Sequence, residues 1–170
     1  MKLKLTILLL TIFCASCKQK EILIEPKVVN VVGELFSDEL LDSNDFKLCI
    51  SQERIVQYYG LGEKTYKGEK QAIIDVFKSL YQPIDANRDS GWVRIRFVVN
   101  CEGISGRFRV LEMDNKYKTK KFDSHIIKQL LEITKKLDGW KAMKMRGYAV
   151  DYYQYLLFKI ENGKLIEIMP

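Results

Sequence analysis

The segment GWVRIRFVV at residues 91–99 decides the fold that this sequence predicts. Every second side chain from Val93 to Val99 is apolar, and Arg94 and Arg96 stand between them. An alternation with a period of two residues is typical of a β-strand that buries one of its faces. Residues 107–111 (RFRVL) alternate in the same way after a turn. The two segments together predict a β-hairpin.

Two amphipathic helices are expected on either side of this hairpin in the sequence. Residues 69–81 carry apolar side chains at helical spacing, and residues 122–137 do the same. Asp123 or Ser124 is a candidate N-cap of the second helix, and Gly139 follows its end, where a left-handed residue is favoured. Each helix therefore presents one apolar stripe to a core.

Two further strands are expected near the C-terminus. Residues 152–160 are dense in aromatic and branched side chains, which favour strands. The Asn162-Gly163 pair is a strong hairpin signal and predicts that residues 164–168 fold back along that strand. The order helix, strand, strand, helix, strand, strand predicts an α+β fold, a two-layer sandwich with two helices packed on a small antiparallel sheet.

The residues before this domain are less regular. Ser51 is a candidate cap for a brief helix over residues 52–58, which Gly60 would end. Residues 31–45 mix apolar and acidic side chains without a clear period. We therefore expect an N-terminal segment at residues 31–59 that packs on a domain at residues 60–170.

The N-terminus has the form of a bacterial lipoprotein signal. Lys2 and Lys4 precede an apolar run that is shorter than the roughly 20 residues of a membrane-spanning helix. The sequence Ala15-Ser16-Cys17 resembles a lipobox, which implies cleavage before Cys17 and acylation of that residue. We expect a signal peptide at residues 1–16, a lipidated tether at residues 17–30 and a chain held at the outer membrane of the cell envelope. The alternative is ordinary cleavage near Ser16, which leaves a soluble secreted protein.

Charge and histidine content exclude several classes of function. The chain has 28 Lys and Arg against 22 Asp and Glu, a net charge of +6, which falls to +4 without residues 1–16. This excess is milder than that of a dedicated nucleic-acid-binding protein. The one histidine, His125, excludes sites built from several imidazoles. No Gly-rich phosphate loop, zinc-ligand spacing or serine nucleophile elbow is present in the sequence, so we expect no cofactor and no metal.

Two cysteines remain after export and acylation, Cys49 and Cys101. In an oxidising compartment such a pair is expected to form a disulfide. The bond would tie the N-terminal segment to the domain. The alternative makes one of the two a nucleophile activated by His125, but the sequence shows no group that would orient the histidine.

Several motifs follow one another between residues 60 and 160. The strand at residues 91–100 and the following Glu102-Gly103 are similar to the pattern G-x-V-x-V-x-F-x-V-x-x-x-G, and Gly139-Trp140-Lys141 closes the second helix in the manner of a W-x-P element. In this order, and with the strand block at residues 148–158, they resemble the C-terminal domain of TonB, the periplasmic part of the Gram-negative energy transducer. The resemblance implies a partner that adds a strand to an exposed sheet edge.

The sequence departs from that family in three places. Ala142 stands where the family has the proline of W-x-P. A lipobox and a short tether replace the membrane helix and the long Pro-rich rod of a transducer. The strand after Asn162-Gly163 could also occupy the edge at which TonB binds its partners. We therefore do not expect the mechanical role of TonB.

Two sets of side chains are candidate contact residues. Four arginines lie on the polar side of the two hairpin strands, where guanidinium groups could bind phosphate or carboxylate; they are Arg94, Arg96, Arg107 and Arg109. Tyrosines of the last strand block could form an aromatic contact surface; they are Tyr148, Tyr152, Tyr153 and Tyr155. The alternatives are a solvated face for the arginines and ordinary strand packing for the tyrosines.

These observations favour a non-enzymatic binding module anchored by lipid in the Gram-negative envelope. Its partner would be an envelope protein, an anionic glycan or a lipid head group, contacted through a sheet edge or the arginines. One alternative is a structural accessory subunit of an outer-membrane transport complex. Another is a small periplasmic hydrolase that depends on His125.

Overall fold

The structure is a computed structural model that describes residues 35–61, 64–84 and 89–169. The predicted signal peptide at residues 1–16, the predicted lipidation site Cys17 and the tether at residues 17–30 lie outside the described residues. None of the helices in the described ranges has the length and apolar character needed to span a bilayer.

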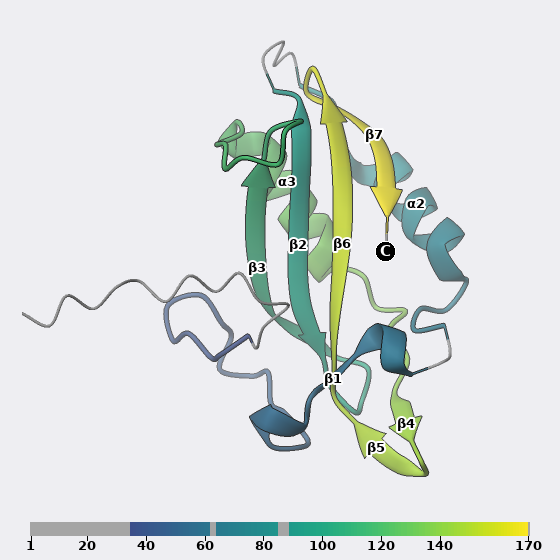
Figure 1. The fold of residues 1–170 in the computed structure, drawn as a ribbon. Helices are drawn as coiled ribbons and strands as arrows, with labels where there is room; N and C mark the ends of the chain where they lie inside the picture. Colours follow the sequence, from purple (N-terminus) through teal and green to yellow (C-terminus); the bar gives the residue numbers. More distant parts are fainter. Residues whose placement is uncertain (1–34, 62–63, 85–88, 170) are drawn as a thin grey trace, which may run out of the picture. The chain divides into compact units, whose positions relative to one another are not determined.

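The sheet is built around one long strand, β6 (Tyr152–Glu161). On one side, β6 pairs antiparallel with β2 (Gly91–Val99), which pairs antiparallel with β3 (Ser105–Met113). On the other side, β6 pairs antiparallel with β7 (Lys164–Met169) and, at its start, parallel with the short β1 (Val56–Gln57). Figure 1 shows β3, β2 and β6 side by side, with β7 beside the far end of β6. The sheet is therefore mostly antiparallel, with β1 as the exception.

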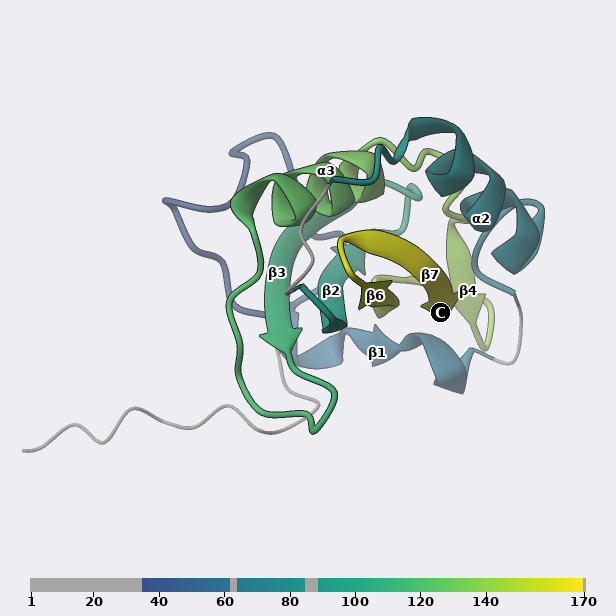
Figure 2. The same ribbon diagram turned by 90° about the horizontal axis from the view of Figure 1, so that it is seen from above.

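Two helices cover one face of this sheet (Figure 2). They are α2 (Glu69–Leu80) and α3 (Ser124–Lys135). Phe77 of α2 and Leu130 of α3 are fully buried in the same cluster as the apolar residues of β2 and β6 that point toward the helices. The α+β class predicted from the order of elements is confirmed, because two helices lie on a mostly antiparallel sheet in the described residues.

The start of α3 shows how the local sequence sets a helix boundary. The carboxylate of Asp123 accepts the backbone N–H of His125 at 2.8 Å, which satisfies one of the N–H groups that a helix leaves free at its first turn. Of the two candidate N-caps, Asp123 is therefore confirmed, and Ser124 is the first residue of the helix. The predicted helices and strands after residue 60 all occur within two residues of their expected bounds.

The predicted helix over residues 52–58 is wrong. A 3₁₀ turn, η1 (Gln52–Arg54), is followed by β1 and a second 3₁₀ turn, η2 (Tyr58–Gly60), and the Ser51 side chain makes no capping hydrogen bond. Pairing with β6 requires extended backbone at β1, because Val56 N–H donates to the carbonyl of Asp151 at 3.1 Å. The contact with a distant strand therefore replaces the local helix.

A small hairpin of β4 (Met143–Met145) and β5 (Tyr148–Val150) was not expected from the sequence. Its turn places Arg146 at φ 52° and Gly147 at φ 84°. Two consecutive residues with positive φ form the type of turn that suits the twist of a hairpin, and Asn-Gly or Asp-Gly is its usual signature. The turn was not predicted because arginine, rather than asparagine or aspartate, stands at its first position.

Candidate functional site

The face of the sheet opposite the helices carries the predicted arginines. Strand alternation places Arg94 and Arg96 of β2 on this side. Arg94 lies opposite Leu111 of β3 and Leu157 of β6, and Arg96 lies opposite Arg109 and Tyr155. We call this surface the outer face and define it by nine residues: Trp92, Arg94, Arg96, Arg109, Leu111, Met113, Tyr155, Leu157 and Lys159. Each is half-buried or exposed.

The N-terminal segment covers one end of the outer face. We call residues 35–55 the strap. Leu35 and Ile55 at its two ends are buried in a small apolar cluster with Val98 of β2 and Tyr153 of β6. Phe46 packs against the same cluster, and it lies so close to β3 that a Cβ on Gly106 would fall 2.2 Å from its ring. Glycine at position 106 thus lets the ring of the strap lie directly on the strand.

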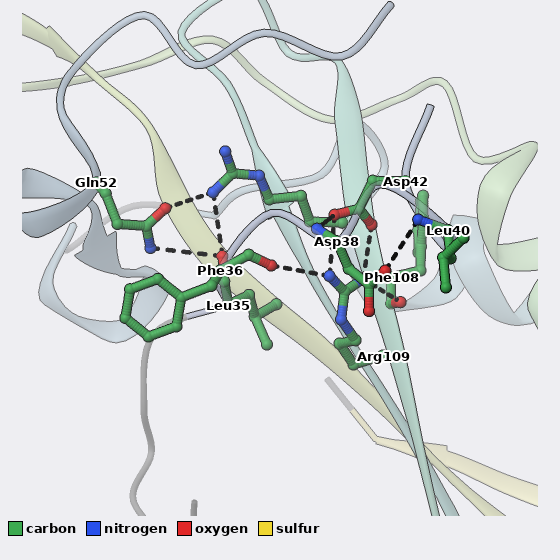
Figure 3. Close-up of polar contacts among 9 residues, drawn as sticks. Leu35, Phe36, Asp38, Leu40, Asp42, Gln52, Phe108 and Arg109 are labelled. Atoms are coloured by element: carbon green, nitrogen blue, oxygen red, sulfur yellow. Dashed lines mark hydrogen bonds and ion pairs between the residues drawn. The ribbon is translucent and has the colours of Figure 1, made fainter. Parts of the chain in front are cut away.

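Arg109 holds the strap through a paired hydrogen bond to one carboxylate. Its two terminal nitrogens donate to the two oxygens of Asp42 at 2.6 and 2.9 Å, and one of them also donates to the carbonyl of Phe36 at 2.8 Å (Figure 3). Such two-point contacts are the strong form of an ion pair. The hydrogen bond from Arg109 lowers the pKa of Asp42, and the same bond raises the pKa of Arg109.

Arg107 holds both ends of the strap in a second network. Its guanidinium donates to the carbonyl of Leu35 at 3.1 Å and to the side-chain oxygen of Gln52. The amide nitrogen of Gln52 in turn donates to the hydroxyl of Tyr153 at 2.8 Å. Arg107 and Arg109 therefore both form hydrogen bonds with residues of the strap. Their partners Asp42 and Gln52 were not identified from the sequence, because each lies more than 50 residues from its arginine.

Arg94 and Arg96 lie beyond the strap, toward the middle of the outer face. The Nε of Arg94 is buried, and within the described residues it has no hydrogen-bond partner and Arg94 forms no ion pair. Its neighbours across the strands are leucines, which supply no acceptor. The guanidinium of Arg96 lies 5.6 Å from the centroid of the Tyr153 ring. Burial, and next the positive charge of Arg94, lower the pKa of Arg96.

Aromatic rings and a further cation occupy the other end of the outer face. Trp92 stacks on Tyr117 of the loop after β3, with ring centroids 6.2 Å apart. Lys159 of β6 lies 6.0 Å from the Trp92 ring and pairs with Glu161 at 2.9 Å. This end of the outer face thus places the cation of Lys159 beside two stacked aromatic rings.

The four predicted tyrosines do not form one surface. Tyr152 is buried in the main core, where its hydroxyl donates to the carbonyl of Lys141 at 3.1 Å and burial raises its pKa. Tyr153 is buried under the strap. Strand packing, the alternative reading, describes both. Tyr148 is exposed on the separate β5 hairpin, which leaves Tyr155 as the one member of the set on the outer face.

Tyr155 makes a contact that the sequence did not suggest. Its hydroxyl lies 3.5 Å from that of Tyr58, and their rings meet edge to face at 5.6 Å. Burial, and then this hydroxyl contact, raise the pKa of Tyr58 to about 12. The Tyr58 phenol therefore stays neutral at physiological pH and acts as a hydrogen-bonding group rather than a charge.

The predicted disulfide between Cys49 and Cys101 is confirmed. Because the two sulfurs are bonded to each other, neither is a free thiol that His125 could activate. His125 itself is exposed at the start of α3, with its Nδ1 2.9 Å from the Asp123 carboxylate. This pair belongs to the helix cap.

No known protein family matches the chain, and neither the curated proteins nor the solved structures contain a significant match.

Proposed function

We propose that this protein is an exported, lipid-anchored binding module of the Gram-negative envelope with a TonB-C-terminal-like domain. The outer face would contact a phosphate or carboxylate group of an envelope partner through Arg94 and Arg96. The proposal includes acylation of Cys17, which would hold the domain at the membrane, and it assigns no catalytic step to the chain.

The observation that carries the proposal is the position of Arg94. A guanidinium has five N–H donors, and a buried donor without an acceptor is uncommon in folded proteins. Leucines flank Arg94 across both neighbouring strands. The positive charges of Arg94 and Arg96 are close enough that Arg94 lowers the pKa of Arg96. Two cations close together in a half-buried setting favour the binding of an anion, which would satisfy the Arg94 donor and reduce the repulsion between the two charges.

The contacts of the strap limit the candidate ligand-binding arginines to Arg94 and Arg96. Arg107 and Arg109 donate to the strap, so a charge change at either residue would disturb the fold as well as any ligand. Arg94 and Arg96 can be altered without removing those bonds. The informative variant therefore pairs Arg94→Gln with Arg96→Gln and leaves the other two arginines in place.

The test is cross-linking in intact cells followed by co-purification and mass spectrometry. The Arg94→Gln, Arg96→Gln pair should reduce partner recovery about tenfold or more, because charge-assisted hydrogen bonds contribute roughly 1.5–3 kcal/mol each. Recovery should also fall as ionic strength rises. A matched control is Lys128→Gln with Lys144→Gln, two exposed lysines of α3 and β4 that lie away from the outer face. This control removes the same charge and should leave recovery unchanged.

Two results would contradict the proposal. One is an equal loss in both charge-neutralised pairs, which would show that only overall charge matters. The other is full recovery with the arginine pair altered in a chain whose disulfide still forms. Arg94→Lys is a further check, because lysine keeps the charge but lacks the planar guanidinium. Partner recovery with this variant should lie between the recoveries of the arginine pair and the lysine pair.

A second candidate function, a structural accessory subunit of an envelope complex, is favoured by a separate feature. An apolar groove of about 580 Å³ lies between α2 and β7, with Phe77 and Tyr81 among its lining residues. Ile166 of β7 lines it and is 51% exposed. If this role is correct, Ile166→Asp should abolish co-purification while the arginine pair leaves it intact.

A further inference from the structure

A second, smaller pocket lies on the helix side of the sheet, apart from the outer face. Its volume is about 310 Å³, and it is bounded by η2, the segment before α2, the first turns of α2 and the strand β6. A water molecule takes up about 30 Å³ in the liquid, so this space is much larger than a single-water site. It lies within the range of small-ligand pockets.

One buried side chain that lines this pocket is only partly hydrogen-bonded. Gln154 of β6 is 2% exposed, and its amide nitrogen donates to the hydroxyl of Thr65 at 3.4 Å. Its amide oxygen has no hydrogen-bond partner among the residues that the structure describes. Both residues line the pocket. A buried carbonyl oxygen normally has a donor, so Gln154 presents an acceptor site to whatever occupies this space.

The walls of the pocket are apolar. The rings of Tyr58 and Tyr66 and the side chain of Ile73 line it beside the Gln154 amide. Tyr66 is held in place by Trp140, with ring centroids 4.7 Å apart in an edge-to-face arrangement. A ligand would therefore combine an N–H or O–H donor with a small apolar body.

The mouth of the pocket favours negative charge. Lys64 and Glu69 form an ion pair with each other there, whereas Lys70 has no ion pair within the described residues. The first turn of α2 also lines the pocket, and its N-cap, Gly68, has no side chain that could accept the free N–H groups. A helix N-terminus without a cap attracts anions, and α2 has 12 residues and therefore a developed dipole.

We propose that this pocket binds the C-terminal residue of a peptide. The amide N–H of that residue would donate to the Gln154 oxygen, its small side chain would lie among Tyr58, Tyr66 and Ile73, and its carboxylate would meet Lys70 at the start of α2. This site is independent of Arg94 and Arg96, so either proposal can fail while the other holds.

Three small compounds separate the recognised groups in the unmodified protein. N-acetylalanine has both the amide N–H and the carboxylate, N-acetylproline lacks the N–H, and N-acetylalaninamide lacks the carboxylate. Titrations of the chain as isolated from cells, followed by ligand-observed NMR, should rank N-acetylalanine first. Its dissociation constant should be about three- to tenfold lower than that of N-acetylproline, as expected for one hydrogen bond.

Two variants assign these preferences to residues. In Gln154→Leu, N-acetylalanine and N-acetylproline should bind equally. The melting temperature should change little, because the variant removes the unsatisfied oxygen together with the long hydrogen bond from the amide nitrogen to Thr65. Lys70→Gln should remove the preference for N-acetylalanine over N-acetylalaninamide. Lys78→Gln is the matched control, because Lys78 lies on the same helix, does not line this pocket and should leave both preferences intact.

Three outcomes would overturn the proposal. The first is the absence of saturable binding of N-acetylalanine. The second is equal binding of all three compounds to the unmodified protein, a result that does not depend on whether a variant folds. The third is a Gln154→Leu chain that still prefers N-acetylalanine over N-acetylproline.

Discussion

The carboxylate of Asp151 accepts the backbone N–H of Cys101 at 2.8 Å. Its second oxygen accepts the backbone N–H groups of Cys49 and Ile50 at 2.8 and 3.1 Å. Asp151 is fully buried at the boundary of β5 and β6. One carboxylate therefore holds the backbones of both disulfide cysteines, which lie 52 residues apart in the sequence. These bonds position the two cysteines in a manner that does not depend on the sulfur bridge itself.

Asp151→Asn should destabilise the protein by about 2–4 kcal/mol. The variant loses charge-assisted bonds and directs an amide N–H₂ group toward buried N–H donors, and each unsatisfied buried donor costs roughly 1–3 kcal/mol. Urea unfolding of the oxidised protein measures the change. Asp138→Asn, at an exposed position, is the control. Equal midpoints for the two variants would show that Asp151 does not hold this junction.

The disulfide should be complete in the exported protein. A free-thiol assay on the denatured, unreduced mature chain should find neither Cys49 nor Cys101 reactive. Replacing both with serine should reduce the free energy of unfolding by about 4 kcal/mol in the chain-entropy model for a loop of this length. A stoichiometric reaction of either thiol would contradict the prediction.

The bond between Asp42 and Arg109 should make the strap sensitive to acid. The pKa of Asp42 is lowered from its ordinary value of 3.8, so the folded state binds the proton less readily than the unfolded state. Its contribution is complete above pH 3.8 and is lost as the pH falls through the lowered pKa. Unfolding free energies measured against pH should therefore fall less steeply for Asp42→Asn than for the unmodified protein below that value. Parallel curves would exclude this role.

Gly106→Ala should displace the strap from β3. The added Cβ would lie 2.2 Å from the Phe46 ring, and overpacking of this kind costs roughly 1–3 kcal/mol. Limited proteolysis should cut the strap faster in this variant. Gly60→Ala is the matched control, because no atom of the described residues lies within 4 Å of a Cβ at that position. In a Phe46→Ala background, the effect of Gly106→Ala should largely disappear. Unchanged cleavage in the single variant would argue against the contact.

Acylation of Cys17 is testable by cell fractionation. The protein with Cys17 in place should remain with membranes in high salt, because several acyl chains give durable anchoring. Cys17→Ser should move it to the soluble fraction and remove the mass of the lipid. A membrane-associated Cys17→Ser chain without lipid would show that another feature anchors the protein.

Periodicity identified most of the elements after residue 60 because their packing follows from local pattern. The alternation from Val93 to Val99 and the helical spacing in α2 and α3 each produce one apolar face, and faces of this kind can be buried only against one another. The region before residue 60 did not follow local pattern. There, pairing of Val56 with Tyr152 overrides the helical tendency of residues 52–58.

The sequence predicted only some of the residues that form the candidate sites. Strand alternation correctly placed Arg94 and Arg96 on the side away from the helices. It could not show that Arg107 and Arg109 are bound to the strap, because no periodic rule links a strand to residues more than 50 positions earlier. Gln154 gave no signal, since a glutamine in a strand is unremarkable until its oxygen is found buried without a donor.

The sequence by itself determined the order of the two helices and the four longer strands in the domain and the pairing of the two cysteines expected to remain after export, because these depend on local periodicity and on a count of thiols. Only the tertiary structure decided which charged groups are already satisfied. Asp42, Gln52 and Asp151 meet their partners across long separations in the chain. The free energy of a polar group depends on the acceptors and donors that folding brings within 3 Å of it, and those neighbours come from the folded topology rather than from adjacent residues.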